Sequence, residues 1–149
     1  MPLVQHTPLT LASTSKWRKQ VLENLGLTIQ TAAPHVDEEQ LKPQFQHLSP
    51  KDMALELARA KGESVPTPNG LILSGDQICA LGAIVYDKPL TTEKQKENLA
   101  ELAGKTHTLF TAICLFEDGS CIYEKVAQTH LTLRPLTASQ IEAFVHLED

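Results

Sequence analysis

Apolar residues recur with helical spacing in four segments of the chain. The first covers residues 16–25 and is followed by Gly26, the residue type that commonly ends a helix in a left-handed conformation. The other three are expected to begin at capping sequences at residues 49–52, 92–95 and 137–140. In the last helix we expect Ile141, Phe144 and Val145 to point inward.

Strand-like segments lie between these helices, at residues 9–11, 28–32, 71–75, 78–85, 106–116 and 121–133. Asp118-Gly119 is the strongest hairpin signal, and residues 78–85 predict a second hairpin that turns near Gly82. Residues 34–48 are predicted to form a mobile loop. The alternation of elements, without a repeat or a linker, predicts one mixed α/β domain over residues 1–149.

Composition narrows the class of protein. The chain has 149 residues, 42% of them hydrophobic, and a net charge of −5, which argues against a nucleic-acid-binding protein with a broad basic surface. Cys79, Cys114 and Cys121 are odd in number and lack C-x-x-C spacing, so we expect buried, reduced thiols. The start of the chain does not resemble a signal peptide, and no apolar run is long enough to span a membrane. A cytoplasmic protein without membrane contact is therefore expected.

An anion site is predicted where the first strand turns into the first helix. Ser13, Ser15 and Arg18 place hydroxyls and a guanidinium beside the unpaired N–H groups of the helix start, which suits a polyphosphate. There are alternatives for each residue. Ser15 would serve only as an N-cap, Arg18 would be a solvated cation, and Trp17 would pack against Val21 in the core.

Further candidate chemistry lies in four other segments. Asp76 follows an apolar strand that is expected to end at Gly75, so its carboxylate would be held at a sheet edge; the alternative is a turn-forming Asp. Lys61 lies on a helix face lined with Ala and Leu, where a snorkelling lysine is the alternative. Lys88 precedes a proline that restricts its backbone, and Glu38 belongs to an acidic pair for which solvent exposure is the alternative.

Taken in order, these segments resemble the Maf family of nucleoside triphosphate pyrophosphatases. The resemblance rests on S-x-S-x-x-R at residues 13–18, Asp-Glu at 37–38, A-x-x-K at 58–61, Gly-Asp at 75–76, Lys-Pro at 88–89 and Gly-Lys-Thr-His at 104–107. It covers essentially the whole chain and implies a mixed α/β fold of the Maf/ITPase type, with a central mixed sheet flanked by helices and two lobes around an active-site cleft. Trp17 and Gln77 look like the branch that hydrolyses 7-methyl-GTP, since the branch acting on dTTP and UTP usually has Thr at position 77.

The resemblance also implies roles for these residues. Asp76 would be the proton acceptor and would share a divalent cation, Mg²⁺ or Mn²⁺, with Glu38. Cations for the phosphates would come from Lys61, Lys88 and Arg18, with Ser13 and Ser15 as further substrate-binding residues and Trp17 and Gln77 as specificity residues. The implied enzyme is a hydrolase of acid anhydrides that splits a nucleoside triphosphate into the monophosphate and pyrophosphate. Its partner would be the nucleotide, and a homodimer is left open.

Three features depart from the family pattern. Lys16 stands where the family commonly has proline, and Ala112 where glycine is frequent. Family members also continue past residue 149 into a Gly-rich segment that closes the nucleotide pocket, so we expect a shortened homologue that lacks the usual C-terminal segment. This leaves two alternatives, a catalytically weak nucleotide-binding or regulatory homologue and a dTTP/UTP pyrophosphatase.

Overall fold

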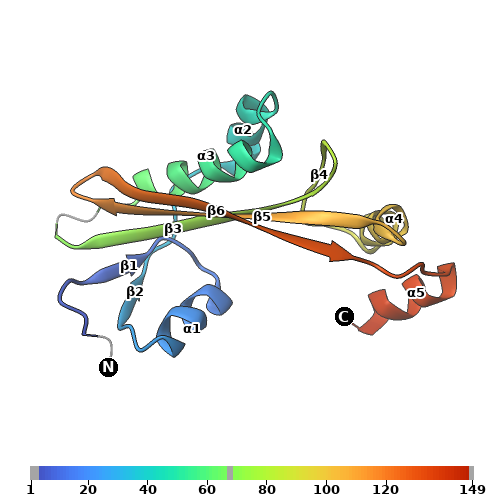
Figure 1. Ribbon diagram of the computed structural model, residues 1–149, viewed down its shortest axis with the longest axis horizontal. Helices are drawn as coiled ribbons and strands as arrows, with labels where there is room; N and C mark the ends of the chain where they lie inside the picture. Colours follow the sequence, from blue (N-terminus) through green and yellow to red (C-terminus); the bar gives the residue numbers. More distant parts are fainter. Residues whose placement is uncertain (1–3, 67–68, 148–149) are drawn as a thin grey trace.

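The computed structural model describes residues 4–66 and 69–147, which contain a six-stranded mixed sheet (Figure 1). Five strands follow the order β2-β1-β3-β5-β6, and β4 pairs with the far end of β3. β1 is parallel to β2 and β3, whereas the β3–β4, β3–β5 and β5–β6 pairs are antiparallel. The strands are β1 (Leu9–Leu11), β2 (Ile29–Thr31), β3 (Leu71–Leu81), β4 (Ile84–Tyr86), β5 (Thr106–Glu117) and β6 (Ser120–Thr132).

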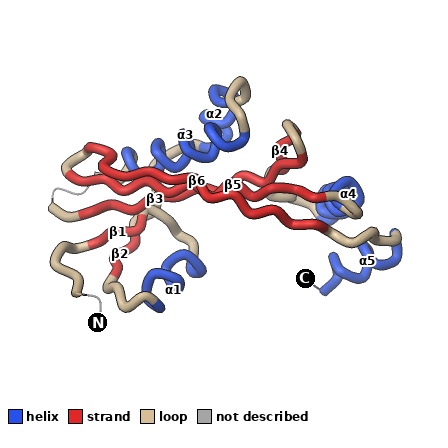
Figure 2. The backbone as a smooth tube through the Cα atoms, in the orientation of Figure 1, coloured by secondary structure: helices blue, strands red, loops and turns tan. Residues whose placement is uncertain are grey.

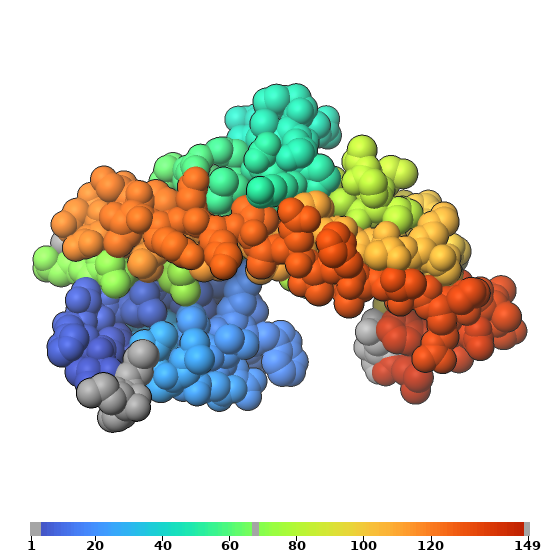
Figure 3. All heavy atoms as spheres, viewed as in Figure 1, coloured from blue at the N-terminus to red at the C-terminus, as the bar shows by residue number. Residues whose placement is uncertain are grey.

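Helices cover the sheet on both faces. They are α1 (Lys16–Asn24), α2 (Glu38–Leu41), α3 (Pro50–Glu63), α4 (Thr92–Leu102) and α5 (Ala138–Leu147). Figure 2 shows α3 on one face, α1 on the opposite face, and α4 and α5 at the far end of the long hairpin. In the space-filling view the molecule is hollowed between the N-terminal residues and α5 (Figure 3). This arrangement confirms the predicted α/β class, with a central mixed sheet and two lobes.

The main core lies between α3 and the sheet. Leu57 and Ala58 are fully buried against a face of β3 and β5 that includes Phe116. The approach of the helix is close, because a Cβ added to Gly62 would stand 2.2 Å from the Phe116 ring. Ser74 Oγ also donates a hydrogen bond of 2.6 Å to the carbonyl of Ala58. These contacts fix the last turns of α3 over the middle of β3.

Several local predictions are confirmed. Gly26 has φ +85°, and it follows α1 as the left-handed residue that ends the helix. Thr137 and Gln140 form the predicted capping box, in which each side chain accepts a hydrogen bond from the other residue's N–H. Positive φ at Asp118 and Gly119 makes the turn between β5 and β6. None of the helices in the described part of the chain has the length and apolar character needed to cross a bilayer.

Two predictions about helices are wrong. Residues 34–48 are not one loop, because Asp37 caps α2 by accepting hydrogen bonds from the N–H groups of Glu39 and Gln40, and a 3-10 helix (Lys42–Phe45) follows. The cap of α4 is Thr91 rather than Thr92, since its hydroxyl accepts from the N–H of Lys94. Both errors come from helix starts whose capping residue is followed by few apolar residues.

Two predictions of burial also need correction. Phe144 is 46% exposed, while Ile141 and Val145 are buried as expected. Of the three cysteines, Cys114 is buried, Cys79 is half-buried and Cys121 is exposed. Cys121 lies in the edge strand β6, where a strand-like sequence does not imply burial.

Candidate active site

The candidate site lies at a gap along one edge of β3. On this edge β3 pairs with β1 through residues 71–73 and with β4 through residues 79–81, so residues 74–78 between them have no strand partner there among the described residues. Asp76 and Gln77 lie in this gap and pair with β5 on the other edge. The sequence prediction that β3 ends at Gly75 is therefore wrong. β1 stops at Leu11 and does not extend alongside Asp76, and because Asp76 lies within β3 the turn-forming alternative is also wrong.

A cavity of about 900 Å³ occupies this region. Eight of the nine candidate residues line it, namely Ser13, Ser15, Trp17, Arg18, Glu38, Lys61, Gln77 and Lys88. The ninth, Asp76, is bonded to Lys61 in the wall of the cavity. The structure thus brings together residues that the sequence places on five separate segments.

A lysine bridges two carboxylates on the α3 side of the gap. Lys61 Nζ lies 2.7 Å from Asp76 Oδ1 and 2.8 Å from Glu38 Oε1. The Lys61 and Asp76 side chains are only 12% and 10% exposed, whereas Glu38 is 42% exposed. The snorkelling alternative for Lys61 is therefore wrong, whereas Glu38 stays partly open to solvent while it bonds to Lys61.

The two carboxylates differ in their affinity for a proton. Burial raises the pKa of Asp76, and the nearby charge of Glu38 adds to this, while the hydrogen bond from Lys61 only partly opposes it. Burial acts in the same direction on Glu38, but the hydrogen bond from Lys61 and the charges of Lys61, Lys42 and Arg18 outweigh it and lower the pKa. Asp76 is therefore the stronger base of the pair.

The start of α1 forms the second wall of the cavity. Ser15 caps the helix by accepting a hydrogen bond from the N–H of Arg18, and Ser13 Oγ accepts one from the N–H of Ser15. Each hydroxyl keeps its own proton free to donate. Arg18 Nη1 donates to the carbonyl of Gly75 at 3.2 Å, a carbonyl that lies on the unpaired stretch of β3. Arg18 is thus held at the gap and is not simply a solvated cation.

Trp17 and Gln77 lie on the opposite face of the sheet from Asp76. Trp17 is 79% exposed and Val21 is 60% exposed, so the alternative in which Trp17 packs with Val21 in the core is wrong. Gln77 Nε2 donates a hydrogen bond of 2.9 Å to Thr111 Oγ1 on β5. This bond orients the amide and leaves its carbonyl oxygen and second N–H for a ligand.

Lys42 and Thr111 contribute to the site but were not predicted from the sequence as functional residues. Lys42 Nζ lies 2.8 Å from Asp87 and 3.9 Å from Glu38, which links α2 to the loop that carries Lys88. The spacing of four residues between Glu38 and Lys42 is the signal for this pair, and it only becomes visible when residues 38–45 are recognised as helical. Within residues 4–66 and 69–147, Lys88 itself has no ion-pair partner.

Comparison with known proteins identifies the family. Residues 8–149 match the family described as Maf-like protein. A nucleoside triphosphate pyrophosphatase of Hyphomonas neptunium is 42% identical over 92% of this chain and 71% of its own length. The 7-methyl-GTP pyrophosphatases of Rhizobium johnstonii and Bdellovibrio bacteriovorus are 36% and 35% identical, over 89% and 95% of this chain and 69% and 73% of their own lengths. A solved HAM1 protein from Coxiella burnetii aligns with a TM-score of 0.49 at 13% identity, over 84% of this chain and 71% of that one. The chain belongs to the Maf family.

Proposed function

We propose that this chain is a nucleoside triphosphate pyrophosphatase and that its substrate is 7-methyl-GTP. The observation that carries the proposal is the meeting of a buried carboxylate–lysine cluster with a cation-rich helix start in one cavity. The names of the relatives in Hyphomonas, Rhizobium and Bdellovibrio support the reaction, and the latter two support the substrate.

The triphosphate would lie between the start of α1 and the loop after β4. Arg18 and Lys88 are the cations on these two sides, and Ser13 and Ser15 supply hydroxyl donors. The positive end of the α1 dipole adds to the attraction. A nucleoside triphosphate carries several negative charges, and this cavity is basic although the chain as a whole has a net charge of −5.

Asp76 would accept the proton of the attacking water. Hydrolysis adds one water across the α–β anhydride, forming a new P–O bond as the bridging P–O bond breaks, and the proton that the water loses needs an acceptor. A carboxylate with a raised pKa is better suited to this task than an ordinary one. Lys61 holds Asp76 in place and, by donating to it, favours its ionised form.

Asp76 and Glu38 are also the residues that would hold a divalent metal. Each carboxylate bonds to the ammonium of Lys61 through one oxygen, Asp76 Oδ1 and Glu38 Oε1, and the second oxygen of each would be the ligand of the metal. Hard oxygen ligands of this kind suit Mg²⁺ or Mn²⁺. Bound there, the ion would neutralise the charge that develops on the phosphates as the anhydride bond breaks.

Trp17 and Gln77 would recognise the base. Methylation at N7 gives guanine a positive charge, and an indole face is the best aromatic partner for a cation. An exposed Trp17 at the rim of the cavity has its ring available for stacking, which a core tryptophan would not. Gln77, fixed by Thr111, offers both a donor and an acceptor to a purine edge.

The test compares kcat/KM for 7-methyl-GTP, GTP and dTTP in the parent and in Trp17→Ala. A cation–π contact of about 0.5–2 kcal/mol predicts a loss of roughly 2- to 30-fold on 7-methyl-GTP and little change on GTP. Val21→Ala is the matched control, since Val21 lies one turn along the same helix and is also exposed. An equal loss on all three nucleotides would refute the role of Trp17, and a parent that prefers dTTP would refute the proposed substrate.

A further inference from the structure

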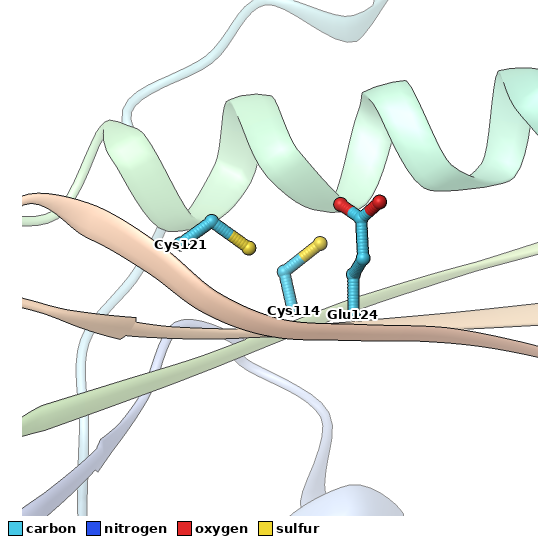
Figure 4. Close-up of side chains that lie close together, drawn as sticks. All are labelled: Cys114, Cys121 and Glu124. Atoms are coloured by element: carbon cyan, nitrogen blue, oxygen red, sulfur yellow. The ribbon is translucent and has the colours of Figure 1, made fainter.

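A second group of potential metal ligands lies outside the cavity. The thiols of Cys114 and Cys121 and a carboxylate oxygen of Glu124 are all within 4.8 Å of one another. Figure 4 shows the three side chains on the face of the β5–β6 hairpin that lies beneath α3, with the Cys121 sulfur directed toward Cys114 and the Cys114 sulfur toward Glu124. None of the three lines the cavity that Lys61 and Gln77 line.

A β-bulge is what brings these residues together. The pairing of β5 with β6 shifts by one residue at the bulge, where Ile122 is the extra residue. In a regular strand Cys121 and Glu124, three residues apart, would point to opposite faces. The bulge places both on the face of Cys114, which pairs directly with Glu124 across the hairpin.

We propose that Cys114, Cys121 and Glu124 bind a thiophilic divalent ion, Zn²⁺ being the best fit, with a fourth position left for water. Zinc–sulfur and zinc–oxygen bonds of about 2.3 and 2.1 Å in a tetrahedron require ligand atoms roughly 3.5–4 Å apart. The observed limit of 4.8 Å is therefore met by side-chain adjustments of about 1 Å, without a change in the strands. Thiolates favour zinc over magnesium, so this site and the carboxylates near Lys61 would select different ions.

Arg59 on α3 is placed to support this site. Its Nη2 donates to Glu124 Oε2, and its Nη1 donates to Glu56. A carboxylate that binds a metal through one oxygen commonly keeps a hydrogen bond on the other, which orients it. Two thiolates, a carboxylate and a dication sum to one negative charge, which the guanidinium of Arg59 would balance.

Binding has to displace the proton of each thiol. Burial raises the pKa of Cys114 to about 12, and the neighbouring Cys121 adds to this. A metal ion supplies the opposing charge that deprotonates a coordinating thiol outright. Exposure of Cys121 leaves an entry path from solvent.

The experiment titrates the reduced, metal-free protein with Co²⁺, which reports thiolate ligands by charge-transfer absorption in the near ultraviolet, and then displaces it with Zn²⁺. We expect one Co²⁺ per chain with this absorption, and a higher Tm when Zn²⁺ is bound. Cys121→Ser should weaken binding on the order of 100-fold, at least as much as the loss of an outer-shell partner. Cys121 is the better position for the variant because it is exposed, whereas Cys114 is buried and its replacement would perturb the core.

Cys79→Ser is the control, since Cys79 is half-buried and lies outside the cluster. It should bind Co²⁺ as the parent does. A parent spectrum without the charge-transfer band, or a Cys121→Ser variant that binds as tightly as the parent, would overturn the proposal. A parent that forms a Cys114–Cys121 disulfide on mild oxidation but binds no Co²⁺ when reduced would also overturn it, in favour of a redox pair.

Discussion

Replacing Lys61 with methionine removes the cation that separates Asp76 from Glu38. Methionine keeps most of the length and apolar stem of lysine, so the change is mainly electrostatic. The Nζ of Lys61 donates to both carboxylates, and its side chain is only 12% exposed. The variant therefore leaves two carboxylates facing each other across the space that the ammonium occupied.

The size of the effect follows from this geometry. Two carboxylate oxygens that bond to one nitrogen are roughly 5 Å apart, and at an effective dielectric constant of about 20 two such charges repel by about 3 kcal/mol. Glu38 is 42% exposed, so water screens part of this repulsion. We expect Lys61→Met to lower the free energy of unfolding by about 2 kcal/mol at neutral pH, which is about 5 °C in Tm for a chain of this size.

The destabilisation by Lys61→Met should depend on pH, and the pKa values of the two carboxyls determine the direction of that dependence. Removing Lys61 takes away the hydrogen bond and the charge that lower the pKa of both carboxyls, so we expect both folded pKa values to rise relative to the parent. A raised folded pKa means that the cost is absent at low pH, where the groups are protonated, and grows as pH rises through the folded pKa. Lys61→Met should therefore destabilise the protein more at about pH 8 than at about pH 5.

The assay is urea unfolding of the parent and the variant at both pH values, with a metal chelator present. Lys19→Met is the control, because Lys19 forms an exposed pair with Glu23 at 3.6 Å that should be worth only about 0.3–0.5 kcal/mol. Equal destabilisation by Lys61→Met at both pH values would refute the electrostatic explanation. Mg²⁺ should restore stability to the variant if the two carboxylates hold a metal, and the absence of any restoration would refute that metal site.

Three further predictions concern Asp76 as the proton acceptor and the packing of Gly62 in the core. Asp76→Asn should lower kcat by at least ~100-fold while the circular dichroism spectrum stays that of the parent, and near-normal pyrophosphate release would exclude Asp76 as the base. The acid limb of kcat/KM in the parent should lie above 3.8, the ordinary value for Asp, because burial raises the Asp76 pKa, so activity falls as pH drops through it; a limb at or below that value would contradict the assignment. Gly62→Ala should cost about 1–3 kcal/mol in urea unfolding because its Cβ would meet the Phe116 ring, whereas Glu63→Ala on the exposed side of the same turn should cost much less.

Local chemistry explains which parts of the fold were predictable. Asp118-Gly119 and the Thr137 capping box act within a few residues, and both form as their sequences predict. The length of β3 was not predictable in this way. Residues 74–77 read Ser-Gly-Asp-Gln, a run with poor strand propensity, yet they stay extended because β5 pairs with them along the whole stretch. Pairing with a distant strand overrides the local preference.

In the candidate site, too, the residue types were predictable from the sequence, but the contacts between them were not. The sequence indicated Glu38, Lys61 and Asp76 as candidate site residues. It does not show that the ammonium of Lys61 bridges the two carboxylates. Trp17 lies four residues before Val21, a spacing typical of two core residues on one helix face. Both are nevertheless exposed, because the other described segments leave this part of the helix uncovered. The pattern of apolar residues does not determine which distant segments contact each other.

The gap beside β3 explains how one short segment would serve both halves of a nucleotide. Side chains alternate along a strand, so Asp76 faces α3 and Lys61, while Gln77 faces the side of α1 and Trp17. Adjacent strands would normally separate these two faces, but in the described part of the chain residues 74–78 have no strand partner on this edge, and the cavity reaches Lys61 on one face and Gln77 on the other. Under the proposed function, the reacting phosphates would lie toward Asp76 and the base toward Gln77. The early end of β1 at Leu11 is then a functional feature of the sheet, because an extension of β1 along β3 would close the gap and separate the proton acceptor from the residues that recognise the base.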